Sequence, residues 1–247
     1  PGMVHVNSPR HVYEVHASLA LIWLPMVAAF VNATAIRDFA QRTSEIVFST
    51  VVTKRQYLLG RFAGSALIAF VPTLGISAGL VVGSWIPYGD AIRFGPNNWA
   101  VHAQALLLFA ACSIAVQSAL MFAVSTYVRS AAGAFVTSIV LVVLNVIATA
   151  YATDVDHRAL ASLLDPLGVE ALDEITRYWS VQESNTALLP LTGALIANRL
   201  LWLAIAAGVF AFGYWRFSFT DRRAKASALV PDSEAPHTAS ALPDVRI

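Results

Sequence analysis

Two short patterns in the chain contain residue types that could do chemistry. Gly75-Ile-Ser77-Ala-Gly79 matches the G-x-S-x-G pattern of serine hydrolases, in which a histidine acts as the base for the serine. His102, near the start of the next apolar segment, could supply that base. The pattern requires a turn between a strand and a helix, whereas Ser77 lies inside an apolar segment. An intramembrane serine hydrolase built on Ser77 and His102 is therefore an alternative, and helix packing is the more ordinary role for this segment.

Metal and nucleotide motifs are absent from the sequence. His11-Val-Tyr-Glu14-Val-His16 lacks the H-E-x-x-H spacing of a zinc-binding helix, so we predict that these are surface loop residues. The G-x-x-x-x-G-K-[ST] loop that cradles ATP phosphates is also missing. We expect the chain to bind no metal and no cofactor, and not to be an enzyme in its own right.

The elements that hold these residues are membrane spans. Hydrophobic residues make up 57% of the chain, charged residues 13%, and the mean hydropathy is +0.63. A helix of about 20 apolar residues crosses the hydrocarbon core, and the apolar runs lack the alternation of barrel strands. The sequence therefore predicts an all-α, polytopic transmembrane bundle. Its five expected spans are residues 17–35, 62–86, 100–128, 132–151 and 191–215.

Most of the 16 Lys and Arg residues lie in the connector 36–61, in the turn after the third span and in the C-terminal tail. Because basic residues are enriched in cytoplasmic loops, we expect these segments to be cytoplasmic. Residues 1–16, read as a loop remnant, and the acidic loop 152–190 would then face outward. Residues 218–247, rich in Ala, Ser, Pro and charge, are predicted to be a disordered tail or a linker. With residue 1 outside, a sixth helix is expected upstream.

The connector 37–60 combines apolar and charged residues and is expected to lie at the membrane surface. It divides into two helical pieces around a break at residues 49–52. Thr53 begins the second piece and is followed three residues later by Gln56, the arrangement of a capping box. From the residues alone, this elbow could be no more than a joint between two spans.

Two groups of residues resemble a known family. In the elbow, Glu45, Ser49-Thr50, Lys54-Arg55 and Tyr57-Leu-Leu-Gly60-Arg61 resemble the coupling region of type-2 ABC transporter permeases, although many relatives have Pro where this chain has Val51. The second group is similar to a subgroup of these permeases fused to an aminopeptidase-like domain. It consists of Asp165-Pro166-Leu167-Gly168, Tyr178-Trp179, Asn185 and Asn198-Arg199-Leu-Leu-Trp202.

The resemblance implies an ABC-type exporter in a bacterial inner membrane, with six helices in each half. The elbow would dock onto a separate ATPase subunit that binds ATP and Mg, and a second permease half, either a homodimer partner or a fused homologous half, would complete the transporter. Five residues would contact the ATPase: Arg37, Asp38, Glu45, Lys54 and Arg55. A helical membrane scaffold without transport is a further alternative.

Other polar and small residues in the spans suggest structural roles. Gly75, Gly79 and Gly83 form small-xxx-small steps that predict close helix packing. Arg199, near the end of the last span, is expected to extend toward the interface as an anchor. A net charge of +1 argues against a broad nucleic-acid surface.

Overall fold

A computed structural model describes residues 2–41, 43–86 and 91–218. The side chain of Glu45 also lies outside the described part, although its backbone is helical. Within these ranges the chain forms helices and no strands. The prediction of an all-α bundle is therefore confirmed.

Five helical segments are long and apolar enough to cross a bilayer, which makes this a multi-pass membrane protein. They are α1 (Pro9–Ala35), α4 (Lys54–Trp85), the continuous segment Trp99–Val128, α7 (Ala132–Ala152) and α11 (Gly193–Arg216). The third span comprises α5 (Trp99–Ala105), a π-helical segment η2 (Leu106–Ala111) and α6 (Cys112–Val128).

The first span begins earlier than expected, so the assignment of residues 1–16 to a loop is wrong for its second half. Ser8 caps α1 by accepting a hydrogen bond from the His11 amide, and Pro9 occupies the first turn, where its missing N–H has no cost. The second span also begins earlier than expected, because α4 starts at Lys54 and not at residue 62. Its predicted capping box is confirmed, with Thr53 and Gln56 each bonding to the other's backbone amide.

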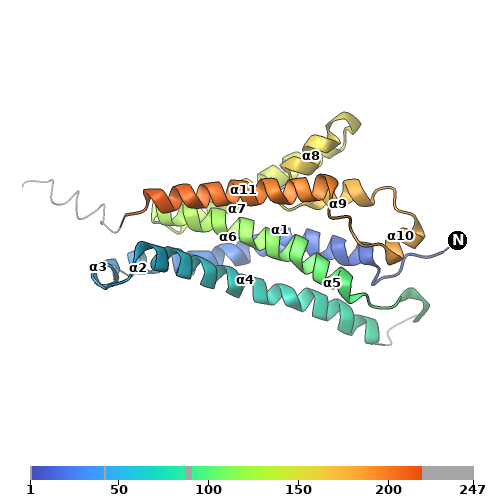
Figure 1. The fold of residues 1–247 in the computed structure, drawn as a ribbon, viewed down its shortest axis with the longest axis horizontal. Coiled ribbons are helices and arrows are strands. Elements are labelled where there is room, and N and C mark those ends of the chain that lie inside the picture. Colours follow the sequence, from blue (N-terminus) through green and yellow to red (C-terminus); the bar gives the residue numbers. More distant parts are fainter. Residues whose placement is uncertain (1, 42, 87–90, 219–247) are drawn as a thin grey trace, which may run out of the picture.

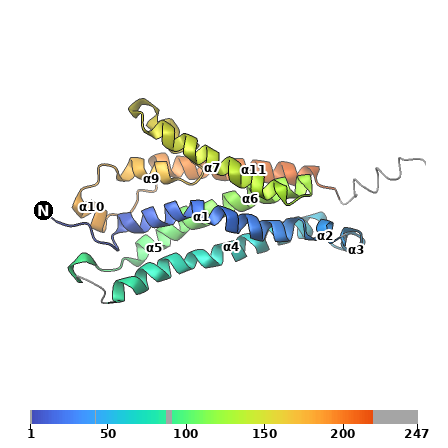
Figure 2. The same cartoon turned by 180° about the vertical axis from the view of Figure 1, so that it is seen from behind.

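Short helices gather at the two ends of the bundle (Figure 1). One end, called here the elbow end, carries α2 (Arg37–Ala40) and α3 (Ser44–Phe48). The opposite end, called the N-terminal end, carries η1 (Ala91–Arg93) and α10 (Val181–Thr186). Three further elements follow α7: η3 (Val155–His157), α8 (Arg158–Leu164) and α9 (Val169–Thr176). Both views show α7 leaning away from the bundle, whereas α4 runs along one edge (Figures 1 and 2).

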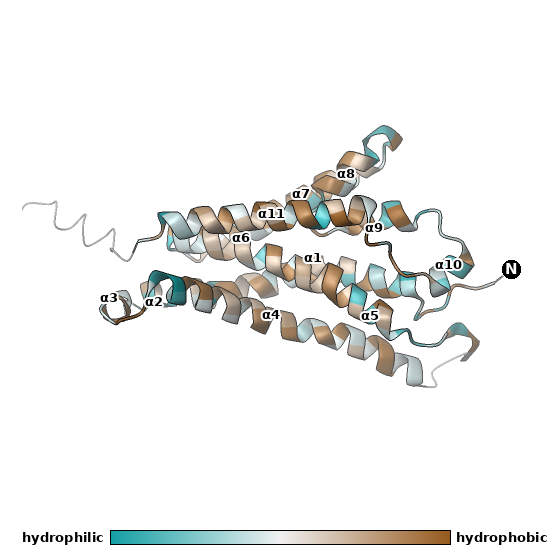
Figure 3. Ribbon diagram, viewed as in Figure 1, coloured by the Kyte–Doolittle hydropathy of each residue, from teal (hydrophilic) through white to brown (hydrophobic). Residues whose placement is uncertain are grey.

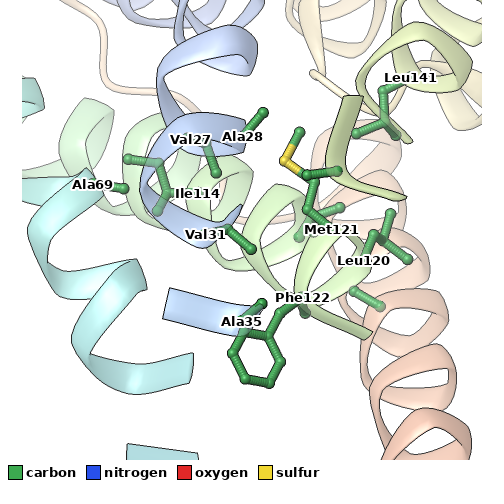
Figure 4. Close-up of a cluster of buried hydrophobic side chains, with 14 of the residues drawn as sticks. Val27, Ala28, Val31, Ala35, Ala69, Ile114, Leu120, Met121, Phe122 and Leu141 are labelled. Atoms are coloured by element: carbon green, nitrogen blue, oxygen red, sulfur yellow. The ribbon is translucent and has the colours of Figure 1, made fainter. Parts of the chain in front are cut away.

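The third span is the most buried and forms the centre of the bundle, with α11, α1, α7 and α4 packed around it. The core near the elbow end includes Val31, Ile114, Met121, Phe122 and Leu141, which converge from α1, α6 and α7 (Figure 4). The other long helices keep many apolar side chains exposed, and Figure 3 shows hydrophobic residues along these helices. In a bilayer those side chains face lipid, so this exposure is the expected state of a membrane bundle.

Close helix packing occurs at glycines other than those predicted. A Cβ added at Gly133 would lie 2.8 Å from Ser125 Cα, where α7 turns back on α6. At Gly75, Gly79 and Gly83, an added Cβ would meet nothing within 4 Å. These three glycines therefore make no close helix contact within the described part of the chain, and packing against another chain remains a prediction.

Candidate functional site

The elbow is closed by a buried carboxylate. Asp38, only 5% exposed, accepts hydrogen bonds at one oxygen from Tyr57 Oη (3.0 Å) and Arg61 Nη2 (2.6 Å). Arg61 Nη1 also donates to the Thr34 carbonyl (2.6 Å) in the last turn of α1. Helix carbonyls at a C-terminus favour a cation. The guanidinium therefore joins α1, α2 and α4 into one unit.

Aromatic rings extend this unit to the last span. Phe217, directly after α11, lies 5.9 Å from Tyr57 in a stacked arrangement and 6.3 Å edge-on from Phe48. Phe39 completes the cluster, 6.4 Å from Phe217 and 5.9 Å from Phe48. Such ring pairs contribute about 0.5–1.5 kcal/mol each beyond the apolar area they bury. The end of α11 is thus seated in the elbow.

Two cations strengthen the same junction. Lys54 Nζ lies 4.7 Å from the Tyr214 ring centre and 3.4 Å from the Trp215 carbonyl oxygen. Arg129, in the turn between α6 and α7, lies over the Phe39 ring at 4.7 Å and donates to the Ser218 carbonyl at 2.9 Å. Elements from four spans therefore meet at the elbow end.

The predicted contact residues lie in different environments. Arg37 and Arg55 are exposed, as a docking surface requires. Lys54 is half-buried against the end of α11, and Asp38 is buried within the elbow. The carboxylate of Asp38 is thus directed into the protein's own fold and not toward a partner. The placement of the Glu45 side chain lies outside the described part.

The tip of the elbow also presents apolar surface that the sequence analysis did not assign to a contact. Ile46 is 69% exposed and Val51 is 99% exposed. Val51 lies in the break between α3 and α4, next to Ser49 and Thr50, and this run has no helical period from which the exposed face could be predicted. Only its position in the connector indicated that Val51 could be exposed.

The second group of family-like residues forms a buried polar joint near α9. Asp165 is fully buried, and one of its oxygens accepts from Asn145 Nδ2 (3.0 Å) and the Leu167 amide (2.8 Å). The other oxygen accepts from the Glu170 amide (2.9 Å) and so caps α9. Gly168 takes a left-handed conformation with φ +81°.

Two side chains of the last span, α11, contact this joint. Asn198 Nδ2 donates to the carbonyls of Ser162 and Asp165, both at 2.7 Å. Arg199 is 3% exposed, donates to Ser113 Oγ at 3.3 Å, and packs so closely under Gly168 that an added Cβ would lie 1.6 Å from Nη2. The prediction that Arg199 reaches the interface is therefore wrong, because its side chain turns into the bundle.

A third polar cluster contains Ser77. Its Oγ lies 3.0 Å from Nε2 of His16 on α1, and Nδ1 of the same imidazole lies 2.8 Å from the Val12 carbonyl. His16 is 1% exposed, so its predicted place in a surface loop is wrong. His102, on α5, is buried as well, and its Nδ1 has no hydrogen-bond partner in the described part. The hydrogen-bond partner of Ser77 is thus His16, not the predicted His102.

Carboxylates line a cavity of about 260 Å³ between α1 and α9, near the N-terminal end. Each of them has a partner within the protein: Glu14 pairs with Arg10, Asp173 with Arg177, and Glu170 accepts from the Thr149 hydroxyl. Among the described residues, no group of three or more His, Cys, Asp or Glu side chains could hold a metal ion.

Comparisons with protein-family models, curated proteins and solved structures find no match to this chain. Its function therefore has to be argued from the elbow and the bundle.

Proposed function

We propose that the chain is the membrane-spanning permease component of an ABC-type exporter in a bacterial inner membrane. ATP and Mg would bind to a partner ATPase subunit, and a second permease half would complete the transport path. The elbow end faces the cytoplasm in this proposal, in agreement with its excess of Lys and Arg. The chain itself supplies no ATP-hydrolysing chemistry.

The observation that carries this proposal is the attachment of the elbow to the bundle. Through Arg61, Asp38 and Phe217, the elbow is joined to α1, α4 and α11. A simple joint between two spans needs only α1 and α4. A force applied to this elbow would move three spans together, which is what coupling to a cytoplasmic motor requires.

A partner ATPase would contact the exposed face of the elbow. Arg37 and Arg55 offer charge there, and Ile46 and Val51 offer apolar surface. Charged groups on a docking surface set orientation and association rate, while the apolar centre supplies most of the affinity. Glu45 and Lys54 flank this face in sequence and belong to the same proposed contact.

The test is a pull-down of the tagged full-length protein in mild detergent, with ATPase activity assayed. We expect an ATPase subunit to co-purify, and Arg55→Glu or Glu45→Lys to reduce its recovery or its stimulation by at least tenfold. Arg216→Glu, at an exposed site at the end of α11, is the matched control and should have little effect. If no ATPase is recruited, the exporter proposal fails and a membrane scaffold without transport is favoured.

A further inference from the structure

We propose that Ser77 is an activated serine with His16 as its general base, and that it accepts the acyl group of a lipid-like ester. This site is separate from the elbow and does not depend on an ATPase partner. Its geometry meets the usual criterion for such a centre, in which nucleophile and base lie within about 2.6–3.2 Å and a third group orients the base. The two distances here are 3.0 Å and 2.8 Å.

The Val12 carbonyl determines how the imidazole is protonated. A carbonyl oxygen can only accept a hydrogen bond, so Nδ1 of His16 carries the proton and Nε2 is left as an acceptor. The Ser77 hydroxyl then donates to Nε2. This is the polarity that proton transfer from a serine nucleophile requires.

Other serines of α4 lack this arrangement. The hydroxyl of Ser65 is fully buried and donates to the Phe62 carbonyl of its own helix, and Ser84 bonds in the same way to Val81. Such bonds back to the helix are the ordinary state of a serine in a span. Ser77 instead reaches across to a titratable group on α1.

The depth of the pair favours a substrate at the edge of the hydrocarbon core. His16 lies seven residues after the start of α1, and Ser77 lies eight residues before the end of α4. At 1.5 Å per residue, both are about 10–12 Å inside the N-terminal end of the bundle. If α1 is centred on a core of about 30 Å, its excess length of about 10 Å is shared between its two ends, and His16 then lies about 6 Å below the core boundary, toward the ester groups of lipids.

A further polar contact joins α1 to α5, three residues before His16. Tyr13 donates to Gln104, and Gln104 donates in turn to the Leu189 carbonyl at 2.8 Å. His102 lies on the same short helix as Gln104 and is also buried. In this proposal its Nδ1, which has no hydrogen-bond partner in the described part, carries the proton and would stabilise charge that develops on the carbonyl oxygen of the substrate.

The chemical step balances within these groups. Ser77 Oγ bonds to the acyl carbon while its proton moves to His16 Nε2. The bond between that carbon and the ester oxygen breaks, and the leaving alcohol takes the proton from the imidazole. A water molecule then attacks the acyl carbon while its proton moves to His16 Nε2. The bond between that carbon and Ser77 Oγ breaks, and the imidazole returns the proton to Oγ.

The test is labelling of the full-length protein in detergent by an alkyl fluorophosphonate, which phosphonylates activated serines with loss of fluoride. We expect mass spectrometry to locate the label on Ser77, at a rate at least tenfold above that of Ser65. His16→Gln should slow labelling at least tenfold, while gel filtration shows that the variant remains folded.

Any of three results would overturn the proposal. Ser77 could stay unlabelled, it could be labelled no faster than Ser65, or its labelling rate could be unchanged by His16→Gln. The pair would then be only a hydrogen bond between α1 and α4. If His16→Gln does not fold, the comparison of Ser77 with Ser65 in the unmodified protein decides the matter alone.

Discussion

Tyr57, in the first turn of α4, stacks against Phe217 just beyond the end of α11, with ring centres 5.9 Å apart and planes 25° from parallel. These residues are 160 positions apart in the sequence, yet both lie at the elbow end, where their contact joins the start of α4 to the end of α11. Through this contact the elbow binds the end of α11, in addition to linking α1 and α4.

We expect Phe217→Ala to remove the contact between the end of α11 and the elbow and to lower the free energy of unfolding by about 3 kcal/mol, as for other buried phenylalanines. A lower thermal midpoint in detergent would show this. Phe212→Ala is the matched control, because Phe212, on α11 just before this contact, is 55% exposed. Equal shifts of the thermal midpoint in the two variants would show that the contact of Phe217 with the elbow does not stabilise the fold.

The Asp38–Arg61 pair should contribute far more than a surface ion pair. Asp38→Ala removes the acceptor for both Tyr57 and Arg61 and leaves a partly buried guanidinium without its carboxylate. Breaking a buried pair in this way costs about 3–5 kcal/mol. In the control Asp173→Ala, Arg177 loses a carboxylate that is 47% exposed, against 7% for the Asp38 side chain, at a cost below about 1 kcal/mol. Thermal unfolding of both variants measures the difference; similar midpoints would show that Asp38 is not a structural clasp.

Gly168→Ala should be severely destabilising for two independent reasons. Gly168 has φ +81°, a conformation that L side chains rarely adopt, and the new Cβ would lie 1.6 Å from Arg199 Nη2. Loss of folded protein on gel filtration is the expected outcome. The control Gly64→Ala places its Cβ in open space on an exposed helix, where alanine is favoured by up to about 1 kcal/mol. A well-folded Gly168→Ala protein would mean that Arg199 does not pack under this turn.

The sequence predicted those features that depend on local patterns. Apolar length defined the five spans, and the Thr53–Gln56 spacing defined the start of α4, because a capping box involves only neighbouring residues. The start of α1 was missed, since the polar residues between Arg10 and His16 suggested a loop. In the structure the polar side chains of this segment pair with one another or bond to α4 and α5, as in Arg10–Glu14 and His16–Ser77, which an isolated hydropathy pattern does not show.

Contacts between distant helices could not be predicted in the same way. Ser77 and His16 are 61 residues apart, and nothing near either residue indicates that α1 and α4 place them together. The inward turn of Arg199 depends on Gly168, Ser113 and Phe109, which come from separate elements. The resemblance to the permease elbow likewise suggested Asp38 as a contact for an ATPase, although tertiary packing buries it.

Acidification is expected to destabilise α10. Glu183 forms a capping box with Ser180, and the hydrogen bonds from the Ser180 amide and hydroxyl lower the pKa of the Glu183 carboxyl below its usual 4.5. Because the folded pKa lies below the unfolded one, the stabilisation of α10 is present above about pH 4.5 and is lost as the pH falls through the folded pKa.

We expect hydrogen-exchange protection of the Ser184 amide, which bonds to the Ser180 carbonyl, to fall on acidification from pH 6 to pH 3, after correction for the intrinsic rate. In Glu183→Gln the side chain can still accept these hydrogen bonds but no longer titrates in this range, so protection should change little with pH. A fall of the same size in this variant would show that another group controls the acid sensitivity of α10.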